Sequence, residues 1–319
     1  MREKMISVAM TTYNGEKFVI QQLESIKNQS INVDEVIICD DKSTDNTCDI
    51  ISHYIFENGL QNWKLVVNDK RLGYAQNFLK AIKLTKGSLI FLSDQDDIWL
   101  ENKVESMSKE FESNPTMEYL HTNIALIDQN GKRINNNYKY NRKTNYNISF
   151  FEFSKRINYC GMSSAFTEKI RNKLTLLNDI EIAAHDWLLP ALAVIDKGFC
   201  ISTKIYTLRR FHGNNVALKI KNNTSKEKSK VQRILMAEKY IQYYSELIKI
   251  FEDNNYLEVN KEDLNILRKF EETAEKRRCC LVESNMKQYI YLLRDIRYFP
   301  NAGIYIKDMI YLLKSINEV

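Results

Sequence analysis

Three carboxylates stand close together in the segment 94–97, Asp-Gln-Asp-Asp, which directly follows the apolar run 89–92. An apolar run of this length preceded by Gly87 predicts a buried parallel strand, and open α/β sheets bind ligands at the carboxyl ends of such strands. Clustered carboxylates there favour a hard divalent cation shared with substrate phosphates, which points to a nucleoside diphosphate. The pattern is short, and the same residue types also form solvated turns or helix caps, so both interpretations stay open on this segment alone.

Four apolar runs in the first hundred residues alternate with amphipathic helical stretches. The runs, which we expect to be strands, are 5–10, 36–39, 65–67 and 89–92. Their order predicts a parallel sheet wound by right-handed crossovers. Polar residues follow each run, in the segments 11–14, 40–43, 68–71 and 94–97. We therefore expect four strands to direct polar side chains into one crevice.

Composition limits the classes of protein. The 319 residues, 44% of them hydrophobic, suffice for one sizeable α/β domain and a smaller appendage. With a net charge of +5 and no dense basic stretch with interleaved aromatics, nucleic acid is not an expected partner. Six cysteines without metal-type spacing and no secretory signal at residues 1–4 predict reduced thiols in the cytoplasm. No segment is apolar enough to span a bilayer, and G-x-G-x-x-G and phosphate-loop motifs are absent, which argues against dinucleotide oxidoreductases and phosphate-loop NTPases.

The composition changes after residue 215. We expect a catalytic domain at 1–218, a Lys/Asn/Ser-rich linker at 219–230 and a helical region at 231–319. Apolar stripes in the helical region are typical of core packing. Its many Tyr residues, with Lys287, Arg294 and Arg297 nearby, also allow a peripheral membrane surface or a homodimer surface.

Five motifs occur in an order that resembles glycosyltransferase family 2, over roughly residues 5–215. They are Thr12–Gly15, Asp40–Thr47, Asp94–Trp99, Cys160–Met162 with His185–Trp187, and Arg210–Asn215. The resemblance implies the GT-A fold of nucleotide-diphospho-sugar transferases, an α/β fold with a doubly wound mixed sheet, here followed by a C-terminal helical extension. Within the family, Asp-Gln-Asp-Asp-Ile-Trp and the late Arg-x-His-Gly-Asn are similar to rhamnosyltransferases of bacterial capsule, O-antigen and cell-wall polysaccharide assembly.

The resemblance implies a nucleotide site after the first two strands. Thr11, Tyr13 and Asp41 match positions that grip the base, with Tyr13 offering a flat face and Asp41 accepting the imide N–H that uracil and thymine share. Capping of the helix that follows is the alternative role for one of Asp40 and Asp41. Lys42 stands where the family usually has Gly, so it either takes the same turn with strain or contacts phosphate.

The resemblance also implies a Mg²⁺ or Mn²⁺ site. Asp94 is expected near the ribose and the ion, Asp96 as the direct metal ligand, and Asp97 beside the diphosphate through water. The ion would neutralise the diphosphate as the sugar–phosphate bond breaks. Arg71 either adds positive charge to this crevice or is simply solvated, and Asn77 faces either the ribose or the solvent.

Asp186 is the expected catalytic base. It opens an apolar helix beside Trp187, an aromatic wall for the acceptor, although Asp at this place would otherwise be read as a helix N-cap. His212 matches a residue that approaches the metal or diphosphate, and Arg210 would clamp a phosphate oxygen with its planar fork. Gly161 would allow close approach of a sugar.

These features predict an inverting glycosyltransferase, class EC 2.4, that moves a sugar from dTDP-rhamnose or a UDP-sugar to a hydroxyl of a glycan or lipid-linked acceptor in bacterial surface polysaccharide synthesis. Because such acceptors are commonly lipid-linked, we expect a cytoplasmic protein placed peripherally at the inner face of the cell membrane. One alternative is a catalytically inactive sugar-nucleotide-binding subunit. Another is a sugar nucleotidyltransferase, which normally has a Gly/Arg-rich triphosphate loop that residues 11–16 do not resemble.

Overall fold

The chain forms two compact units in a computed structural model that describes residues 5–134, 141–156, 159–177, 180, 182–211 and 226–316. The first, which we call the sheet unit, comprises Met1–Ile148 and Asn158–Asn215. The second, the helical unit, comprises Ser149–Ile157 and Val216–Val319.

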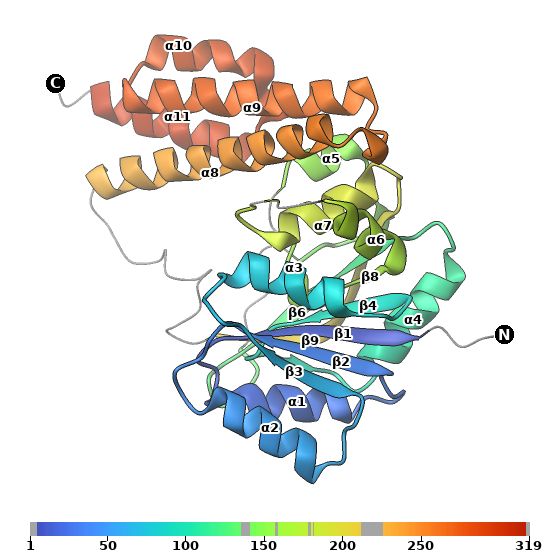
Figure 1. Cartoon of the computed structure of the whole chain (residues 1–319). Helices are drawn as coiled ribbons and strands as arrows, with labels where there is room; N and C mark the ends of the chain where they lie inside the picture. Colours follow the sequence, from blue (N-terminus) through green and yellow to red (C-terminus); the bar gives the residue numbers. More distant parts are fainter. Residues whose placement is uncertain are drawn as a thin grey trace. The chain divides into compact units, whose positions relative to one another are not determined.

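Four parallel strands form the first half of the sheet unit, as the alternation of apolar runs predicts. They are β1 (Ile6–Thr12), β2 (Glu35–Asp40), β3 (Trp63–Val67) and β4 (Leu89–Ser93), in the spatial order β3-β2-β1-β4. Val8, Ile38 and Phe91 are fully buried, because helices cover both faces of this part of the sheet. Helices α1 (Val19–Lys27) and α2 (Thr47–Glu57) lie on one face, and α3 (Tyr74–Leu84) lies on the other (Figure 1).

The second half makes the sheet mixed. The strands are β5 (Ile98–Trp99), β6 (Tyr119–Ile127), β7 (Tyr146–Asn147), β8 (Ser164–Thr167) and β9 (Phe199–Arg210), and they extend the order to β3-β2-β1-β4-β8-β6-β9-β5 with β7 on β9. Strand β8 runs antiparallel to both β4 and β6. Strand β5 pairs antiparallel with β9, so the acidic segment 94–97 is a loop held between two strands of one sheet.

Three helices and one short 3₁₀ helix complete the sheet unit around this loop. They are α4 (Lys103–Ser113), η1 (Gly161–Ser163), α6 (Glu168–Leu176) and α7 (His185–Val194). The apolar helix that the sequence predicts after His185 is therefore present as α7.

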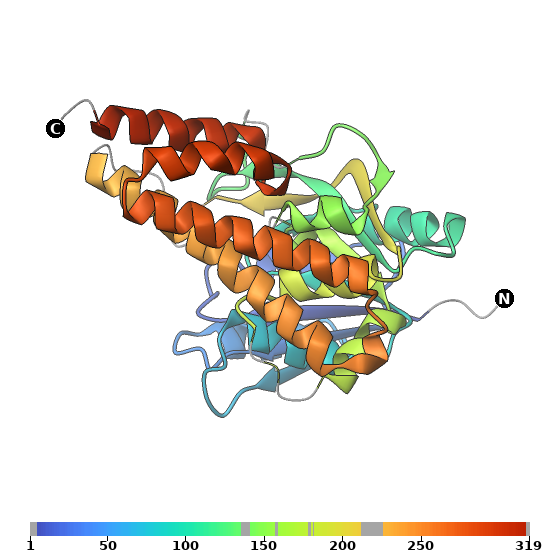
Figure 2. The ribbon, with the colours of Figure 1, turned by 90° about the horizontal axis from the view of Figure 1, so that it is seen from above.

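The helical unit consists of α5 (Phe150–Ser154), α8 (Lys226–Asp253), η3 (Asn255–Leu257), α9 (Lys261–Val282), α10 (Met286–Tyr291), η4 (Leu292–Tyr298) and α11 (Ala302–Ile316). The two long helices α8 and α9 lie side by side as a hairpin (Figure 2). Among the described residues, no helix combines the length and the apolar character needed to cross a bilayer.

The structure corrects the predicted boundaries in two places. Helix α8 begins at Lys226, inside the predicted linker 219–230, because Lys and Glu are good helix formers even where the composition is polar. Residues 219–225 lie outside the described part of the chain. Helix α5 belongs to the helical unit although it precedes half of the sheet unit in sequence: Tyr244 donates a hydrogen bond to the Ser154 carbonyl (2.7 Å), and the ring of Phe153 packs against Tyr243.

A buried ionic network joins three helices of the helical unit. Asp308 of α11 is fully buried and accepts from Arg277 Nε of α9 at 2.6 Å and from the Tyr289 hydroxyl of α10 at 3.2 Å. Arg233 of α8 also donates to this carboxylate. Removal of one partner from such a network leaves the other charge buried without compensation.

Replacement of Asp308 with Ala should therefore lower the free energy of unfolding of the helical unit by about 3 kcal/mol. Urea denaturation followed by circular dichroism measures this, while fluorescence follows the sheet unit separately because the three tryptophans (63, 99 and 187) all lie there. Asp295→Ala is the matched control: this half-buried Asp pairs with Lys276 only at 3.9 Å, so we expect a change within about 0.5 kcal/mol. Equal effects of the two substitutions would contradict the importance of the buried network.

Candidate active site

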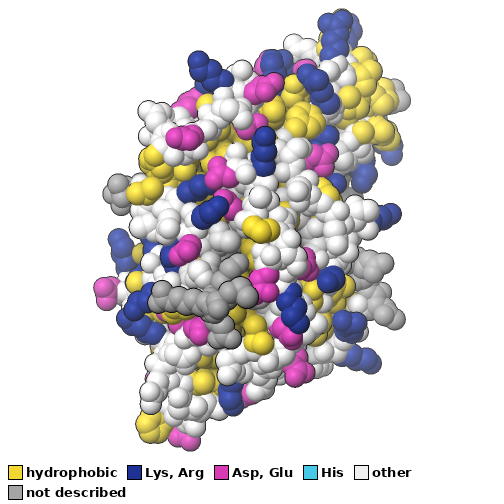
Figure 3. All heavy atoms as spheres, turned by 90° about the vertical axis from the view of Figure 1, so that its right-hand side faces the viewer, with side chains coloured by type: hydrophobic (Ala, Val, Ile, Leu, Met, Phe, Trp, Pro, Cys, Tyr) yellow, Lys and Arg dark blue, Asp and Glu magenta, His cyan; other side chains and the backbone are white. Residues whose placement is uncertain are grey.

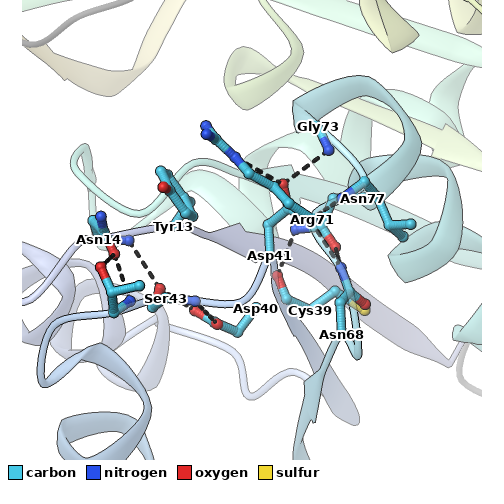
Figure 4. A network of polar contacts seen from close by, with 12 residues as sticks. Tyr13, Asn14, Cys39, Asp40, Asp41, Ser43, Asn68, Arg71, Gly73 and Asn77 are labelled. Carbon is cyan, nitrogen blue, oxygen red and sulfur yellow. Dashed lines mark hydrogen bonds and ion pairs between the residues drawn. The ribbon is translucent and has the colours of Figure 1, made fainter.

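Hydrogen bonds between side chains and backbone join the polar loops that follow β1 and β2 (Figure 4). Asp40 accepts from the Thr12 hydroxyl at 2.7 Å and from the backbone N–H and hydroxyl of Ser43 at 2.7 and 2.6 Å. The N–H of Asn14 donates to the Ser43 hydroxyl at 2.8 Å. The two segments that the sequence predicts to bind a nucleotide are thus one connected surface at the carboxyl edge of the sheet.

Asp41 points toward the start of α3. Its carboxylate is 3% exposed and accepts from the backbone N–H groups of Leu72 (2.6 Å) and Gly73 (2.9 Å) and from Asn68 Nδ2 (3.1 Å). The hydrogen bonds of Asp40 and Asp41 therefore hold neighbouring loops, and neither residue takes the alternative role of capping α2.

Arg71 covers one face of the ring of Tyr13. Its guanidinium carbon lies 3.8 Å from the ring centroid, and its Nε lies 3.9 Å from Asp41 Oδ2. The Arg71 side chain is 62% exposed, so this contact lies at the solvent boundary. The structure therefore places Tyr13, Asp41 and Arg71 together, as the prediction of a shared crevice requires (Figure 4).

Gln95, to which the sequence analysis assigned no role, ties the acidic loop to the Tyr13 loop. It accepts from the Tyr13 N–H at 2.8 Å and donates to the Tyr13 carbonyl at 3.0 Å. A Cβ at Gly15 would lie 2.2 Å from Gln95 Oε1, so only glycine leaves room for this clamp. Glycine in the first motif and Gln inside the acidic motif are the sequence signals of this contact.

The three carboxylates of the acidic loop converge. One oxygen each of Asp94, Asp96 and Asp97 lies within 4.8 Å of the others. Burial, and then the charge of Asp96, raise the pKa of Asp94 to about 6, and the same two causes raise the pKa of Asp97 well above its usual range. Asp97 Oδ2 is buried without a hydrogen-bond partner among the described residues. Concentrated negative charge and an unsatisfied carboxylate oxygen fit a hard divalent cation.

Arg210 corrects a prediction, because it binds the acidic loop and not a phosphate. It is fully buried at the end of β9, where Nε donates to the Asp96 carbonyl (2.9 Å), one terminal nitrogen to the Gln129 carbonyl (3.0 Å) and the other to Gln21 Oε1 (2.5 Å). Its backbone N–H donates to Asp97 Oδ1 at 3.0 Å. The planar fork is thus spent on protein acceptors, and Asp97 points into the protein.

Asp186 lies in the first turn of α7 and is half-buried. The N-cap of this helix is Ala184, so the capping role that Asp would otherwise suggest does not apply. A carboxylate in the first turn still benefits from the helix dipole, which favours its ionised form. Trp187 is buried, so most of its ring contacts the protein and little is left to form the predicted wall for an acceptor.

Comparison with known proteins agrees with this arrangement. The family described as Glycosyl transferase family 2 matches residues 7–175, more than half of the chain. The chain belongs to glycosyl transferase family 2. The match ends before α7, so the family assignment rests on the nucleotide loops, the acidic loop and the central sheet.

Family 2 relatives include enzymes of polysaccharide synthesis. Chondroitin synthase of Escherichia coli is 29% identical over 219 residues, which cover 68% of this chain and 30% of that protein. The dTDP-rhamnosyl transferase RfbG of Shigella flexneri is 29% identical over 218 residues, which cover 65% of this chain and 72% of that protein. The chain spans 49% of the Escherichia coli beta-1,3-glucosyltransferase WfgD, so several relatives are much longer than the matched region.

A solved structure shows the same fold. TarS 1-349 of S. aureus in complex with UDP-GlcNAc superimposes with a TM-score of 0.59 and 16% identity, covering 98% of this chain and 91% of that one. The GT-A fold predicted from the motifs is confirmed.

Two further predictions for this family 2 domain need correction. Asn77 faces neither ribose nor solvent: it is buried, donates to the Cys39 carbonyl at 2.8 Å and accepts from Asn68 at 2.9 Å, which binds α3 to β2. Gly161 does not leave room for a sugar, because a Cβ there would lie 2.6 Å from His185 Nε2. Both side-chain positions are occupied from inside the unit.

Lys42 keeps the turn that glycine usually makes. Its φ of 63° lies in the left-handed region, which carries strain for a residue with a Cβ, and its Nζ donates to the Asp69 carbonyl at 2.9 Å. Of the predicted metal or diphosphate contacts, His212 lies outside the described residues, as does the motif up to Asn215.

Lys103 is a buried cation that sequence reasoning missed. It opens α4 four residues after Trp99, is fully buried, and donates from Nζ to the Met162 carbonyl (2.7 Å) and to the Thr207 hydroxyl (3.1 Å). Nζ also lies 3.9 Å from the Trp99 ring centroid. Burial lowers the pKa of Lys103 well below its usual range, and the charges of Asp97 and Asp94 oppose that shift.

His185 is a buried, neutral imidazole next to Asp186. It stacks on Phe78 with ring centroids 4.0 Å apart, and both ring nitrogens lack partners among the described residues. Burial lowers its pKa to about 3, whereas an unfolded His has a pKa of about 6.5. Between these values the unfolded chain binds more protons, so the stability that neutral His185 contributes is present above about pH 6.5 and is lost as the pH falls.

His185→Phe should remove this dependence. Relative to wild type, the free energy of unfolding of the variant should rise by up to about 1.4 kcal/mol for each pH unit of acidification between about pH 6 and pH 4. Urea denaturation at several pH values, followed by tryptophan fluorescence, measures the difference. His53→Phe, at an exposed position of α2, is the control and should leave the pH dependence unchanged. Parallel curves for wild type and His185→Phe would rule out a buried neutral imidazole.

Proposed function

We propose that this chain is an inverting, metal-dependent glycosyltransferase that moves a sugar from dTDP-rhamnose or a UDP-sugar to a hydroxyl of a glycan or lipid-linked acceptor in bacterial surface polysaccharide synthesis. The observation that carries the proposal is the convergence of Asp94, Asp96 and Asp97 within 4.8 Å, beside the two nucleotide loops, in a family 2 domain. The names of the relatives support the pathway class, since they include a dTDP-rhamnosyl transferase and polysaccharide synthases.

The acidic loop would hold Mg²⁺ or Mn²⁺ through Asp94 and Asp96, the two half-buried carboxylates. When bound, the ion supplies Lewis-acid stabilisation to the departing diphosphate. Asp97 keeps its neighbours in place, because one of its oxygens accepts from the backbone of Arg210. Gln95 then couples the position of this loop to Tyr13, so the ion site and the nucleotide site move as one.

Asp186 serves as the base in this proposal. Its carboxylate takes the proton from the acceptor hydroxyl, that oxygen forms a bond to the anomeric carbon, and the bond from this carbon to the diphosphate oxygen breaks on the opposite side. The electron pair leaves with the nucleoside diphosphate, which needs no proton at that moment. One base therefore suffices, unlike glycoside hydrolysis, which needs an additional acid for its leaving group.

The donor base is proposed to be a pyrimidine. Asp41 has three hydrogen bonds from the protein, and a carboxylate has about four lone-pair positions, so one position is left for an imide N–H. Arg71 lies over Tyr13 at the solvent boundary, where it can either move off the ring or approach the phosphates. A thermal-shift panel of UDP, dTDP and GDP and their sugars, with and without Mn²⁺, tests this choice. A stronger shift with GDP would contradict the assignment.

Substitutions at the two carboxylates should have different effects. Asp96→Asn should abolish the Mn²⁺-dependent thermal shift together with turnover, whereas Asp186→Asn should keep nucleotide binding and lower turnover by about 100-fold or more. Release of nucleoside diphosphate from the sugar nucleotide measures turnover. Asp69→Asn is the control, because Asp69 is exposed at the same edge of the sheet.

Three outcomes would refute this mechanism. Full turnover of Asp96→Asn or Asp186→Asn removes the proposed roles. Release of pyrophosphate in place of nucleoside diphosphate identifies a nucleotidyltransferase. Donor binding by the wild-type chain without turnover on any sugar acceptor identifies a binding subunit.

We also propose that α10, η4 and α11 form a surface that binds anionic membranes. Ile306, Ile310 and Leu313 of α11 are 44–47% exposed at the spacing of one helical face. The surface further exposes apolar side chains at 290, 291 and 293, and basic ones at 287, 294, 297, 307 and 314. The helical unit in Figure 3 shows hydrophobic side chains gathered beside Lys and Arg. Apolar contact combined with positive charge is what an anionic bilayer surface favours.

Ile310→Glu should weaken binding to vesicles that contain anionic phospholipid about tenfold or more, because it places negative charge in the apolar stripe. Co-sedimentation with vesicles at low and physiological salt measures this. Phe56→Glu is the matched control, since Phe56 is an exposed apolar residue of α2 in the sheet unit. If neither protein binds vesicles but Ile310→Glu converts a dimer to a monomer in light scattering, the surface is a dimer interface.

A further inference from the structure

We infer that η1, residues Gly161–Ser163, is the connector that sets the position of the acidic loop relative to the helix bearing Asp186, and that Lys103 and His185 are its positioning residues. The meaning of the two ends rests on the proposed function. The connector itself rests on contacts that are independent of any ligand.

Lys103 holds the end of η1 nearest the acidic loop. Its Nζ donates to the carbonyl of Met162 at 2.7 Å, and the same group lies over the ring of Trp99, the last residue of the strand that follows the acidic loop. Lysine is almost never fully buried unless its donors are paired. Among the described residues no carboxylate lies within 4.0 Å of this Nζ, so its hydrogen bonds go to Met162 and Thr207. The contacts of Lys103 thus join η1 to the β5 side of the acidic loop.

His185 holds the opposite end. Its imidazole occupies the space where a Cβ of Gly161 would lie, 2.6 Å from Nε2, and it is wedged there by its stack on Phe78. The two ring nitrogens make no hydrogen bond among the described residues, so His185 acts here through its shape. Because His185 and Asp186 are consecutive in the first turn of α7, the fit at Gly161 also fixes where the Asp186 backbone begins.

The middle of η1 is tied to the sheet. The Thr122 hydroxyl of β6 donates to the Ser163 carbonyl at 2.9 Å, and both the N–H and the hydroxyl of Ser163 donate to the Cys160 carbonyl. Each residue of η1 is therefore held by a different element: Gly161 by α7, Met162 by α4 and Ser163 by β6. These side-chain contacts join η1 to its three neighbours, so loss of one contact should let the two ends shift.

Such a shift has a large kinetic consequence. A base and a leaving-group site must be aligned at near-contact distance, and a displacement of about 1 Å caused by a remote mutation can cost about 100-fold in rate. A positioning role therefore predicts that binding of each ligand survives while transfer is lost. A role in the charge of the acidic loop predicts that metal binding is lost as well.

The test compares Lys103→Met, which keeps the length of the side chain but removes its donors, with Lys109→Met, an exposed lysine of the same helix. Amide hydrogen exchange of the peptide spanning 159–167 should speed up about tenfold or more in Lys103→Met and stay unchanged in Lys109→Met. Calorimetric Kd values for Mn²⁺ and for UDP and dTDP should stay within about threefold of wild type. The kcat for nucleoside diphosphate release should fall about tenfold or more, with KM for the donor unchanged.

Thr122→Val is the second variant, because it removes one hydroxyl of nearly equal size and should raise exchange in the same peptide. Gly161→Ala displaces His185, and combined with Lys103→Met it should give a non-additive loss of kcat, since both act through η1.

Three results would overturn the inference. One is unchanged exchange in both Lys103→Met and Thr122→Val. Another is a loss of Mn²⁺ affinity equal to the loss of kcat, and the third is full additivity of the double variant. If the wild-type chain turns over no donor, the proposed function fails alone and the exchange measurements still decide the connector.

Discussion

Uncompensated negative charge at the carboxyl edge of the sheet is the constraint around which the sheet unit is arranged. Three carboxylates within 4.8 Å repel one another, and burial adds a desolvation cost, so the pKa of Asp94 rises to about 6. The fold answers with positively charged groups on the protein side. Arg210 binds the loop backbone, and Lys103 lies fully buried nearby, where the loop charges act against the fall in its pKa. The side left without such compensation is where a cation fits.

Side-chain contacts, more than strand pairing, align the parts of the site. The sheet places the loops after β1, β2 and β4 at one edge, since parallel strands end together. It does not set the distance between the loops. Gln95 sets it between the acidic loop and Tyr13, Asp41 between β2 and α3, and Lys103 between the acidic loop and η1. The glycines at 15 and 161 are required because neighbouring side chains occupy the space of their Cβ atoms.

Several polar residues that resemble ligand-binding groups in the sequence serve the protein instead. Arg210 and Asn77 have the chemistry to bind phosphate or ribose, yet both are buried and bonded to backbone carbonyls. The reason is energetic: a buried polar group without a partner costs more than a typical hydrogen bond contributes, so loops with irregular backbone recruit such side chains. Asp186 escapes this role because the N-cap of its helix is Ala184.

The sequence by itself determined the parallel order of the first four strands, the GT-A fold and the grouping of the acidic loop with the nucleotide loops, because hydrophobic periodicity and short-range motifs are local properties. It did not reveal the contacts of Gln95, Lys103 and His185, nor that α5 packs with helices some 90 residues later in the chain. Those depend on which side chains meet across the fold, and a side chain's type does not state whether its partner is a ligand or a carbonyl. Only the tertiary structure decided that, since burial and partner choice are set by packing.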